Sequence, residues 1–186
     1  MRARRLVALL PLVLTACGYN TIQTYDEKAN AAKQQIEVQL QRRADLIPNL
    51  VEVVRGQAKQ ELEVFTQVAR ARSGLVDAVQ KGDPRQMAEA NEQLTGAMKG
   101  LMIQVEAYPQ IKSDQAFLRL QDELTGTENR IAVARTDLNG AVESYNTYIR
   151  KFPQVMTAKV IGAKPKEYFE VANAAAREAP KIDLTK

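Results

Sequence analysis

Cys17 is the only cysteine of this 186-residue chain, and it follows a short apolar segment and two small residues. The segment, residues 6–13, has about eight apolar residues, far fewer than the ~20 of a membrane-spanning helix. Three arginines precede it, which gives the charged-then-apolar order of an export signal. The run Leu14-Thr15-Ala16-Cys17 is typical of a lipobox, where a signal peptidase cuts before a cysteine whose sulfur has been acylated. We therefore predict a signal peptide over residues 1–16 and lipid attachment at Cys17.

Acylation would hold the mature protein at a membrane, since each buried methylene adds ~0.8 kcal/mol of membrane affinity. An exported chain with one cysteine cannot form an internal disulfide, so acylation also accounts for the thiol. An inert cysteine inside a cleaved secretory signal is the alternative. The predicted location is the cell envelope. Gly18 in place of an aspartate is typical of sorting to the outer membrane, facing the periplasm; the other option is the outer face of the cytoplasmic membrane.

The sequence lacks the usual catalytic residue sets. Without histidine, and with its only thiol assigned to lipid, the chain cannot build Ser-His or Cys-His pairs or the common zinc ligand sets. No GxGxxG or P-loop motif occurs. We therefore predict no catalytic residue, no metal site and no cofactor. Asp122, Glu123 and Glu128 lie close together along the chain and could serve a metal-dependent or glycoside-cleaving enzyme, but such clusters usually form a solvated helix face.

The charge balance gives no reason to expect a nucleic-acid partner. Cleavage after residue 16 removes three of the 26 basic residues and none of the 22 acidic ones, leaving 23 against 22. The mature chain is thus close to neutral, and the net charge of the precursor says nothing about what it binds.

Apolar residues recur at three- and four-residue steps along most of the mature chain, which is the pattern of amphipathic helices. The stripes run from Ile36 to Val79, from Met87 to Tyr108 and from Phe117 to Ile149. We predict an all-α fold: an elongated antiparallel up-and-down bundle of three long helices with short C-terminal helices, similar to a four-helix bundle.

Prolines and capping residues mark where these helices should end. Pro48 lies inside the first stripe and predicts a kink or a helix junction over residues 44–48. Gly82-Asp83-Pro84 combines a C-terminal glycine, an N-cap and a proline at the first helical position, so it predicts a turn. Pro109 should end the second helix, Ser113 can cap the third, and Pro153 should end it.

The C-terminal part is less regular. Short helices are predicted over residues 155–161, ended by Gly162, and over residues 170–177. The resulting organisation is a tether over residues 17–25, a helical domain over residues 26–177 and a tail over residues 178–186.

Two segments carry more information than a generic helix. The first is Gln39-Leu40-Gln41-Arg42-Arg43-Ala44-Asp45-Leu46-Ile47-Pro48-Asn49-Leu50-Val51-Glu52; the second extends from Tyr108-Pro109 through Glu128-Asn129-Arg130-Ile131-Ala132 to Phe152-Pro153. Together they resemble the LemA family over nearly all of the mature chain. The resemblance implies an all-helical bacterial envelope protein with a membrane-bound amino terminus, in a family whose molecular activity is generally unassigned.

Polar residues of these segments form the candidate site. We expect a network between the two segments that fixes helix register, with a docking face for a partner protein as the alternative. Replacing Arg43 by alanine separates the two hypotheses, because lost thermal stability favours the first and a lost partner favours the second. The candidates are Arg42, Arg43, Asp45, Asn49, Glu128, Asn129, Arg135 and Asn146.

The sequence therefore favours a non-enzymatic lipoprotein that acts as a helical scaffold or protein-interaction module at the membrane. An envelope enzyme that uses only Asp and Glu, with a metal ion, is the first alternative. A protein that opens its bundle around acyl chains is the second. Neither the protein partner nor the oligomeric state follows from the sequence.

Overall fold

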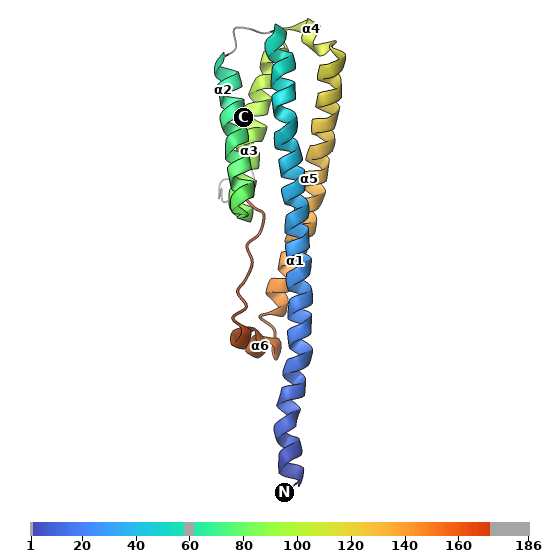
Figure 1. The fold of residues 1–186 in the computed structure, drawn as a ribbon, viewed down its shortest axis with the longest axis vertical. Coiled ribbons are helices and arrows are strands. Elements are labelled where there is room, and N and C mark those ends of the chain that lie inside the picture. Colours follow the sequence, from blue (N-terminus) through green and yellow to red (C-terminus); the bar gives the residue numbers. More distant parts are fainter. Residues whose placement is uncertain (1, 58–61, 172–186) are drawn as a thin grey trace, which may run out of the picture.

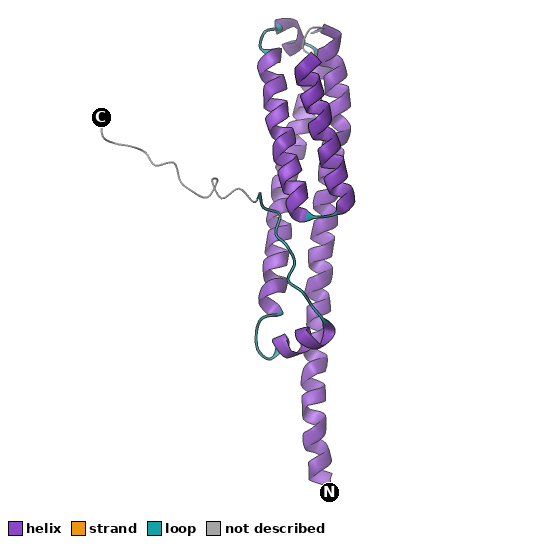
Figure 2. Cartoon of the chain, turned by 90° about the vertical axis from the view of Figure 1, so that its left-hand side faces the viewer, coloured by secondary structure: helices purple, strands orange, loops and turns teal. Residues whose placement is uncertain are grey.

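Long helices run up and down beside one another and give the chain the shape of a rod (Figure 1, Figure 2). This computed structural model describes the backbone of residues 2–57 and 62–171 and the side chains of residues 18–56 and 63–171. Within those ranges the regular elements are helices, without strands, and the predicted all-α bundle is confirmed. They are α1 (Arg2–Gln57), α2 (Leu62–Lys81), α3 (Pro84–Val105), α4 (Pro109–Lys112), α5 (Gln115–Tyr148) and α6 (Gln154–Ile161).

The rod has two parts that differ in how many helices they contain. α1 and α5 run side by side along much of it, whereas α2 and α3 lie only at the end away from α6 (Figure 1). At ~1.5 Å per residue α2 and α3 are each roughly 30 Å long, while α5 reaches about 50 Å. We call the end with α1, α2, α3 and α5 the four-helix part. The other end, where α1 and α5 are the two long helices and the short α6 packs against them, is the two-helix part.

An apolar core fills the four-helix part. Each long helix contributes side chains that are almost completely buried, such as Leu50 from α1, Leu75 from α2, Leu94 from α3 and Leu138 from α5. Along α1 the buried positions recur at three- and four-residue steps, so the apolar stripe faces the other helices as predicted. These α1 positions are Ile36, Leu40, Ala44, Ile47, Leu50 and Val54.

The first apolar stripe belongs to two helices, not to one. α1 ends at Gln57, α2 begins at Leu62, and the two helices pack against each other in opposite directions (Figure 1). In the described part of the chain, four long helices therefore replace the three that the sequence predicts. The spacing could not reveal this reversal, because residues 58–61 contain no glycine or proline and apolar residues continue at helical steps. Ala58, which the stripe includes, lies outside the described residues.

α1 continues through Pro48, although the sequence predicts a kink or a junction over residues 44–48. Proline has no N–H, so the carbonyl of Ala44 loses its helical donor. Arg72 of α2 replaces that donor, since its Nε lies 2.8 Å from the Ala44 oxygen. Asn49, the residue that follows Pro48, is exposed. The hydrogen bond that proline removes within α1 is thus supplied by the neighbouring helix.

Replacing Pro48 by alanine should make Arg72 dispensable, because the new N–H can donate to the Ala44 carbonyl. We expect Arg72→Met to lower the free energy of unfolding by about 1–2 kcal/mol in the natural sequence. In the Pro48→Ala background the loss should be smaller by about 1 kcal/mol. Denaturant unfolding of the four proteins measures this coupling, with Arg70→Met as an exposed control on the same helix. Equal losses in both backgrounds would contradict the assignment.

Local capping signals are mostly found where the sequence places them. Asp83 caps α3 by accepting hydrogen bonds from the N–H groups of Arg85 and Gln86, at 2.9 and 3.3 Å. Gly82, just before it, has a φ of +66°, which is why a glycine is needed there. At the start of α5 the cap is Asp114 and not Ser113, because only the Asp114 carboxylate accepts from the first turn.

Replacing Asp83 by alanine should lower the free energy of unfolding by about 1 kcal/mol, while asparagine, which still caps, should cost less. Burial acts to raise the pKa of Asp83, but the hydrogen bonds from Gln86 and the backbone outweigh it and lower that pKa. The stabilisation that the Asp83 carboxylate contributes should therefore be complete above about pH 4. It should disappear as the pH falls through the lowered pKa of Asp83. Urea unfolding between pH 7 and pH 2.5 measures this. If the free energy of unfolding of the natural sequence and of the Asp83→Asn variant changed with pH in the same way, the prediction would be contradicted.

The C-terminal region is only partly as predicted. α6 is the expected short helix, and Gly162 ends it with a φ of +71°. Residues 163–171 then return along the rod without regular structure, so residues 170 and 171 do not begin the predicted helix. Residues 172–177 and the predicted tail lie outside the described residues. Figure 2 shows this returning segment, which we call the strap, beside α1 and α5.

Residues 17–25, predicted as a tether, are helical and belong to α1. Packing explains this difference, because Ile22 is buried against Tyr145, Ile149 and Ala158 in a small second core. Tyr25 joins the same cluster, and its ring centroid lies 5.1 Å from that of Tyr148. The residues next to Cys17 are therefore fixed to α5 and α6 by apolar contacts.

Candidate functional site

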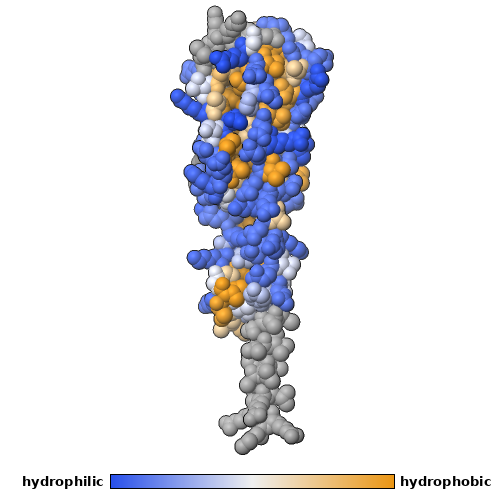
Figure 3. All heavy atoms as spheres, viewed as in Figure 1, coloured by the Kyte–Doolittle hydropathy of each residue, from blue (hydrophilic) through white to orange (hydrophobic). Residues whose placement is uncertain are grey.

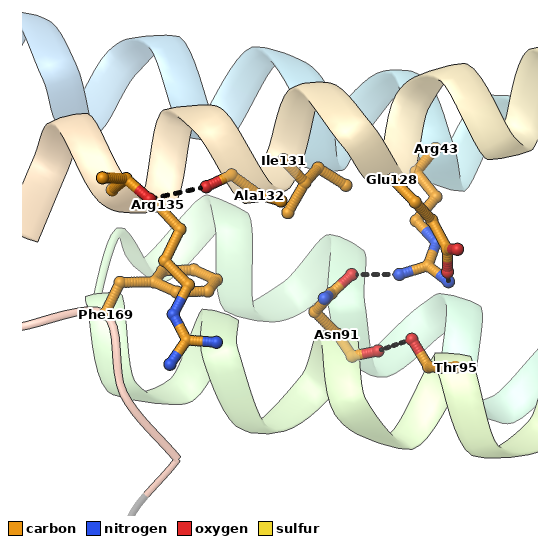
Figure 4. Close-up of a pocket in the computed structure, with 9 residues that line it drawn as sticks. Arg43, Asn91, Thr95, Glu128, Ile131, Ala132, Arg135 and Phe169 are labelled. Carbon is orange, nitrogen blue, oxygen red and sulfur yellow. Dashed lines mark hydrogen bonds and ion pairs between the residues drawn. The ribbon is translucent and has the colours of Figure 1, made fainter.

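Arg43 of α1 connects three helices in the middle of the four-helix part. One guanidinium nitrogen donates to Asn91 Oδ1 of α3 at 2.5 Å, and another donates to Glu128 Oε1 of α5 at 2.6 Å. The Arg43 side chain is only 4% exposed, whereas that of Glu128 is 50% exposed. The structure thus brings together one residue from each motif segment, and Asn91 as the third member (Figure 4).

The electrostatics of this link are unfavourable for the buried cation. Burial lowers the pKa of Arg43, and the negative charge of Glu128 opposes that shift without cancelling it. In addition, Arg43 Nε is buried and has no hydrogen-bond partner within the described residues. A buried cation lowers the stability of a fold when its desolvation penalty exceeds the stabilisation from its charged partner.

A groove opens between α3 and α5, and Arg43 lies at its base. Two cavities, of about 440 and 480 Å³, follow one another along it and share Arg43, Thr95 and Glu128. The first, shown in Figure 4, also reaches Phe169 of the strap. The second is more apolar. We call these two cavities the α3–α5 groove; the apolar side chains of its second cavity are Met98, Met102, Ile103 and Leu124.

The other candidate residues of the first motif segment point to solvent. Arg42, Asp45 and Asn49 are exposed, and the described partner of Asp45 is Gln41, four residues earlier on the same helix, at 2.8 Å. They do not join Arg43 in a network. The alternation follows from helix geometry, because only positions three or four residues from the buried Leu40 and Ile47 face the bundle.

The candidates on α5 separate into three environments. Arg135 is exposed and lines the first cavity of the α3–α5 groove, whereas Asn129 is exposed and lines a separate cavity beside α1. Asn146 is buried in the two-helix part. The eight candidates are therefore not one cluster, and only Arg43, Glu128 and Arg135 belong to the α3–α5 groove.

Asn146 fixes the strap to α5. Its side-chain amide donates to the Lys166 carbonyl at 2.9 Å and its oxygen accepts from the Lys166 N–H at 2.8 Å. Asn139, two helical turns earlier, makes the same pair of bonds with Phe169, at 3.3 and 2.8 Å. Seven helical residues rise ~10.5 Å, and three extended residues span about 10 Å, so the two pairs match in register. The strap thus packs along the part of α5 that lies beyond the ends of α2 and α3 (Figure 1).

The Lys166 side chain ties the strap to α1 as well. Its Nζ lies 3.0 Å from Asp26 Oδ1 and 2.8 Å from Asn30 Oδ1, and it lies 5.4 Å from the centre of the Tyr145 ring. Burial, followed by the charge of Asp26, raises the pKa of Tyr145. At the other end of the strap, Phe169 enters the main core.

Sequence reasoning did not single out several residues of these contacts. No local pattern marks these residues, and they lie outside both motif segments. They are Asn91, Thr95, Lys166 and Phe169. A second polar link, in which Arg130 Nε donates to Gln39 Oε1 at 3.0 Å, joins the quoted motif segments directly. Both residues stand in those segments, so the resemblance could have indicated them.

Two further findings concern the alternatives. Within the described residues, no three Asp, Glu or Cys side chains come close enough to hold a metal ion, and Asp122 and Glu123 are exposed on α5. No helix in the described ranges has an apolar stretch long enough to cross a bilayer. The backbone of Cys17 is part of α1, and its side chain lies outside the described set.

Comparison with known proteins bears on most of the chain. The sequence model of the LemA family matches residues 32–184. Magnetosome protein MamQ 2 and magnetosome protein MamQ 1 of Paramagnetospirillum magneticum are each 32% identical over 178 residues, covering 82% of this chain and 64% of the relative. Magnetosome protein MamQ of Magnetospirillum gryphiswaldense is 30% identical over 187 residues, covering 88% of this chain and 68% of the relative. The chain thus spans about two thirds of the length of these relatives, and it belongs to the LemA family.

Proposed function

We propose that the protein is an envelope lipoprotein that binds a helical segment of a partner protein in the α3–α5 groove, as a membrane-anchored scaffold. In this proposal the signal peptide of residues 1–16 is removed and Cys17 carries the lipid. The helical domain, predicted from residue 26, extends back to residue 18, because residues 18–25 belong to α1 and pack against α5 and α6. The protein then recognises a partner and catalyses no reaction.

The observation that carries the proposal is the buried Arg43 at the base of the α3–α5 groove. Stability alone does not account for an arginine at this position, because burial disfavours the cation more than Glu128 favours it. Beside this polar pair the groove offers Met98, Met102 and Leu124 as an apolar surface. Grooves between two helices suit an amphipathic helix, and methionine adapts to irregular partners.

A photo-crosslinking amino acid at Ile103 tests the docking surface. Ile103 lines the groove and is 69% exposed, and Val38, 59% exposed on α1 outside the groove, is the matched control. In living cells we expect one discrete crosslinked protein from position 103 and none from position 38. The crosslinked peptide of the partner should be helical and amphipathic. The same product from both positions, or none from position 103, would refute the groove as the binding surface.

Intact mass of the protein extracted from its own membranes tests the anchor. We expect a chain that starts at Cys17 and carries two or three acyl chains, and a Cys17→Ser variant that keeps the full precursor mass. An unacylated natural product would exclude the lipoprotein assignment without touching the groove.

A further inference from the structure

Large apolar side chains on and beside α6 point away from the protein. Phe152 is 83% exposed and Val160 is 87% exposed, with Met156 between them more than half exposed. They are not needed for packing, because the opposite side of α6 already buries Thr157 and Ala158, the latter against Ile22, Tyr145 and Ile149. Figure 3 shows an apolar patch over this end of the molecule. Exposed apolar groups that gather in one place mark a binding surface more often than chance.

The segment that carries this patch has charges of only one sign. Residues 149–164 contain four basic residues and no acidic one, and residues 18–25 beside them contain no charged residue at all. The rest of the mature chain has 19 basic and 22 acidic residues, so this is a local concentration of positive charge. Apolar residues flanked by lysine and arginine are the composition of surfaces that lie in the interface of an anionic bilayer. The four basic residues are Arg150, Lys151, Lys159 and Lys164.

The position of α6 along the rod is the third observation. Gly18, the residue that follows Cys17, lies against α6, since a methyl group added to it would be 3.4 Å from Thr157 Oγ1 and 3.9 Å from Gln154 Cγ. α6 is therefore at the same height along α1 as the first residue after the lipid attachment point. If Cys17 carries acyl chains inserted in a bilayer, α6 lies at the surface of that bilayer.

We propose that Phe152, Met156 and Val160 insert into the headgroup region of an anionic membrane and, with the flanking basic residues, hold the rod upright on it. This inference rests on the proposed lipid anchor. The acyl chains supply attachment, and the α6 surface fixes orientation, because two separate contacts prevent the rod from tilting about a single flexible one. The α3–α5 groove is then held at a set distance from the membrane.

Because the chain has a single cysteine, a label at a new cysteine can report how deeply α6 lies in the membrane. Cys17 is the only cysteine, and in the proposed lipoprotein its sulfur is acylated, so Val160→Cys introduces the only free thiol. The full acylated protein is labelled there with an environment-sensitive fluorophore and reconstituted into vesicles of phosphatidylethanolamine and phosphatidylglycerol that carry lipid-bound quenchers. Val133→Cys on α5, also highly exposed, is the matched control. Both sites face solvent, so labelling leaves the core intact.

The expected result is quenching at position 160 at least five-fold stronger than at position 133, and weaker at 160 when Lys151 and Lys159 are replaced by glutamate. Protein that floats with the vesicles but is quenched equally weakly at both positions would overturn the inference and leave the anchor standing. Protein that does not float with the vesicles would overturn the proposed anchor, and the inference with it.

Discussion

Glu128→Ala is expected to destabilise the protein more than Arg43→Met, although Glu128 is half exposed and Arg43 is buried. Removing Glu128 leaves a buried cation whose burial penalty is no longer opposed, and we expect a loss of about 2 kcal/mol in the free energy of unfolding. Replacing Arg43 by methionine removes that cation and keeps most of its aliphatic volume, while Glu128 can be hydrated. The expected change is within about 1 kcal/mol of zero, in either direction.

Denaturant unfolding of the two variants, with the exposed Glu143→Ala as a control on the same helix, gives both values. The relative size of the two losses in the free energy of unfolding separates the docking hypothesis from the structural one. A stable Arg43→Met protein that loses the crosslink from position 103 would favour a docking role for the polar pair. A loss in Arg43→Met as large as in Glu128→Ala would instead favour the structural hypothesis, in which the link fixes helix register.

Asn146→Ala is expected to lower the free energy of unfolding by about 2–3 kcal/mol. It removes both bonds to Lys166, so an N–H and a carbonyl of the strap lose their partners at a part-buried site. The strap also brings Phe169 into the main core, and loosening it weakens that contact. Asn129→Ala, at an exposed position of the same helix, should change stability by less than about 0.5 kcal/mol.

Hydrogen exchange localises the effect of this substitution. Amides of residues 166–169 should exchange faster in Asn146→Ala, while those of α2 and α3 keep their rates. Asn139 and Asn146 hold the same strap, so the double variant should lose less than the sum of the two single losses. Additive losses, or an Asn146→Ala protein as stable as Asn129→Ala, would show that the strap is held mainly by apolar contacts.

The sequence by itself determined the helical class and most helix ends. Amphipathic periodicity reports which face of a helix is apolar, and caps such as Asp83 depend on atoms within a few residues. It also indicated the motif residues Arg43 and Glu128 as candidates. What it could not determine is which partner each face meets.

Only the tertiary structure decided the contacts between distant segments. The reversal between α1 and α2 left the apolar spacing undisturbed, so the periodicity predicted one helix where the structure has two. The donor for the Ala44 carbonyl comes from Arg72, and the partners of Asn139 and Asn146 are backbone groups of a strap that has no sequence pattern. The physical reason is the same in each case: a local pattern specifies the donors and acceptors that a segment leaves open, whereas the packing of the whole chain selects the groups that satisfy them.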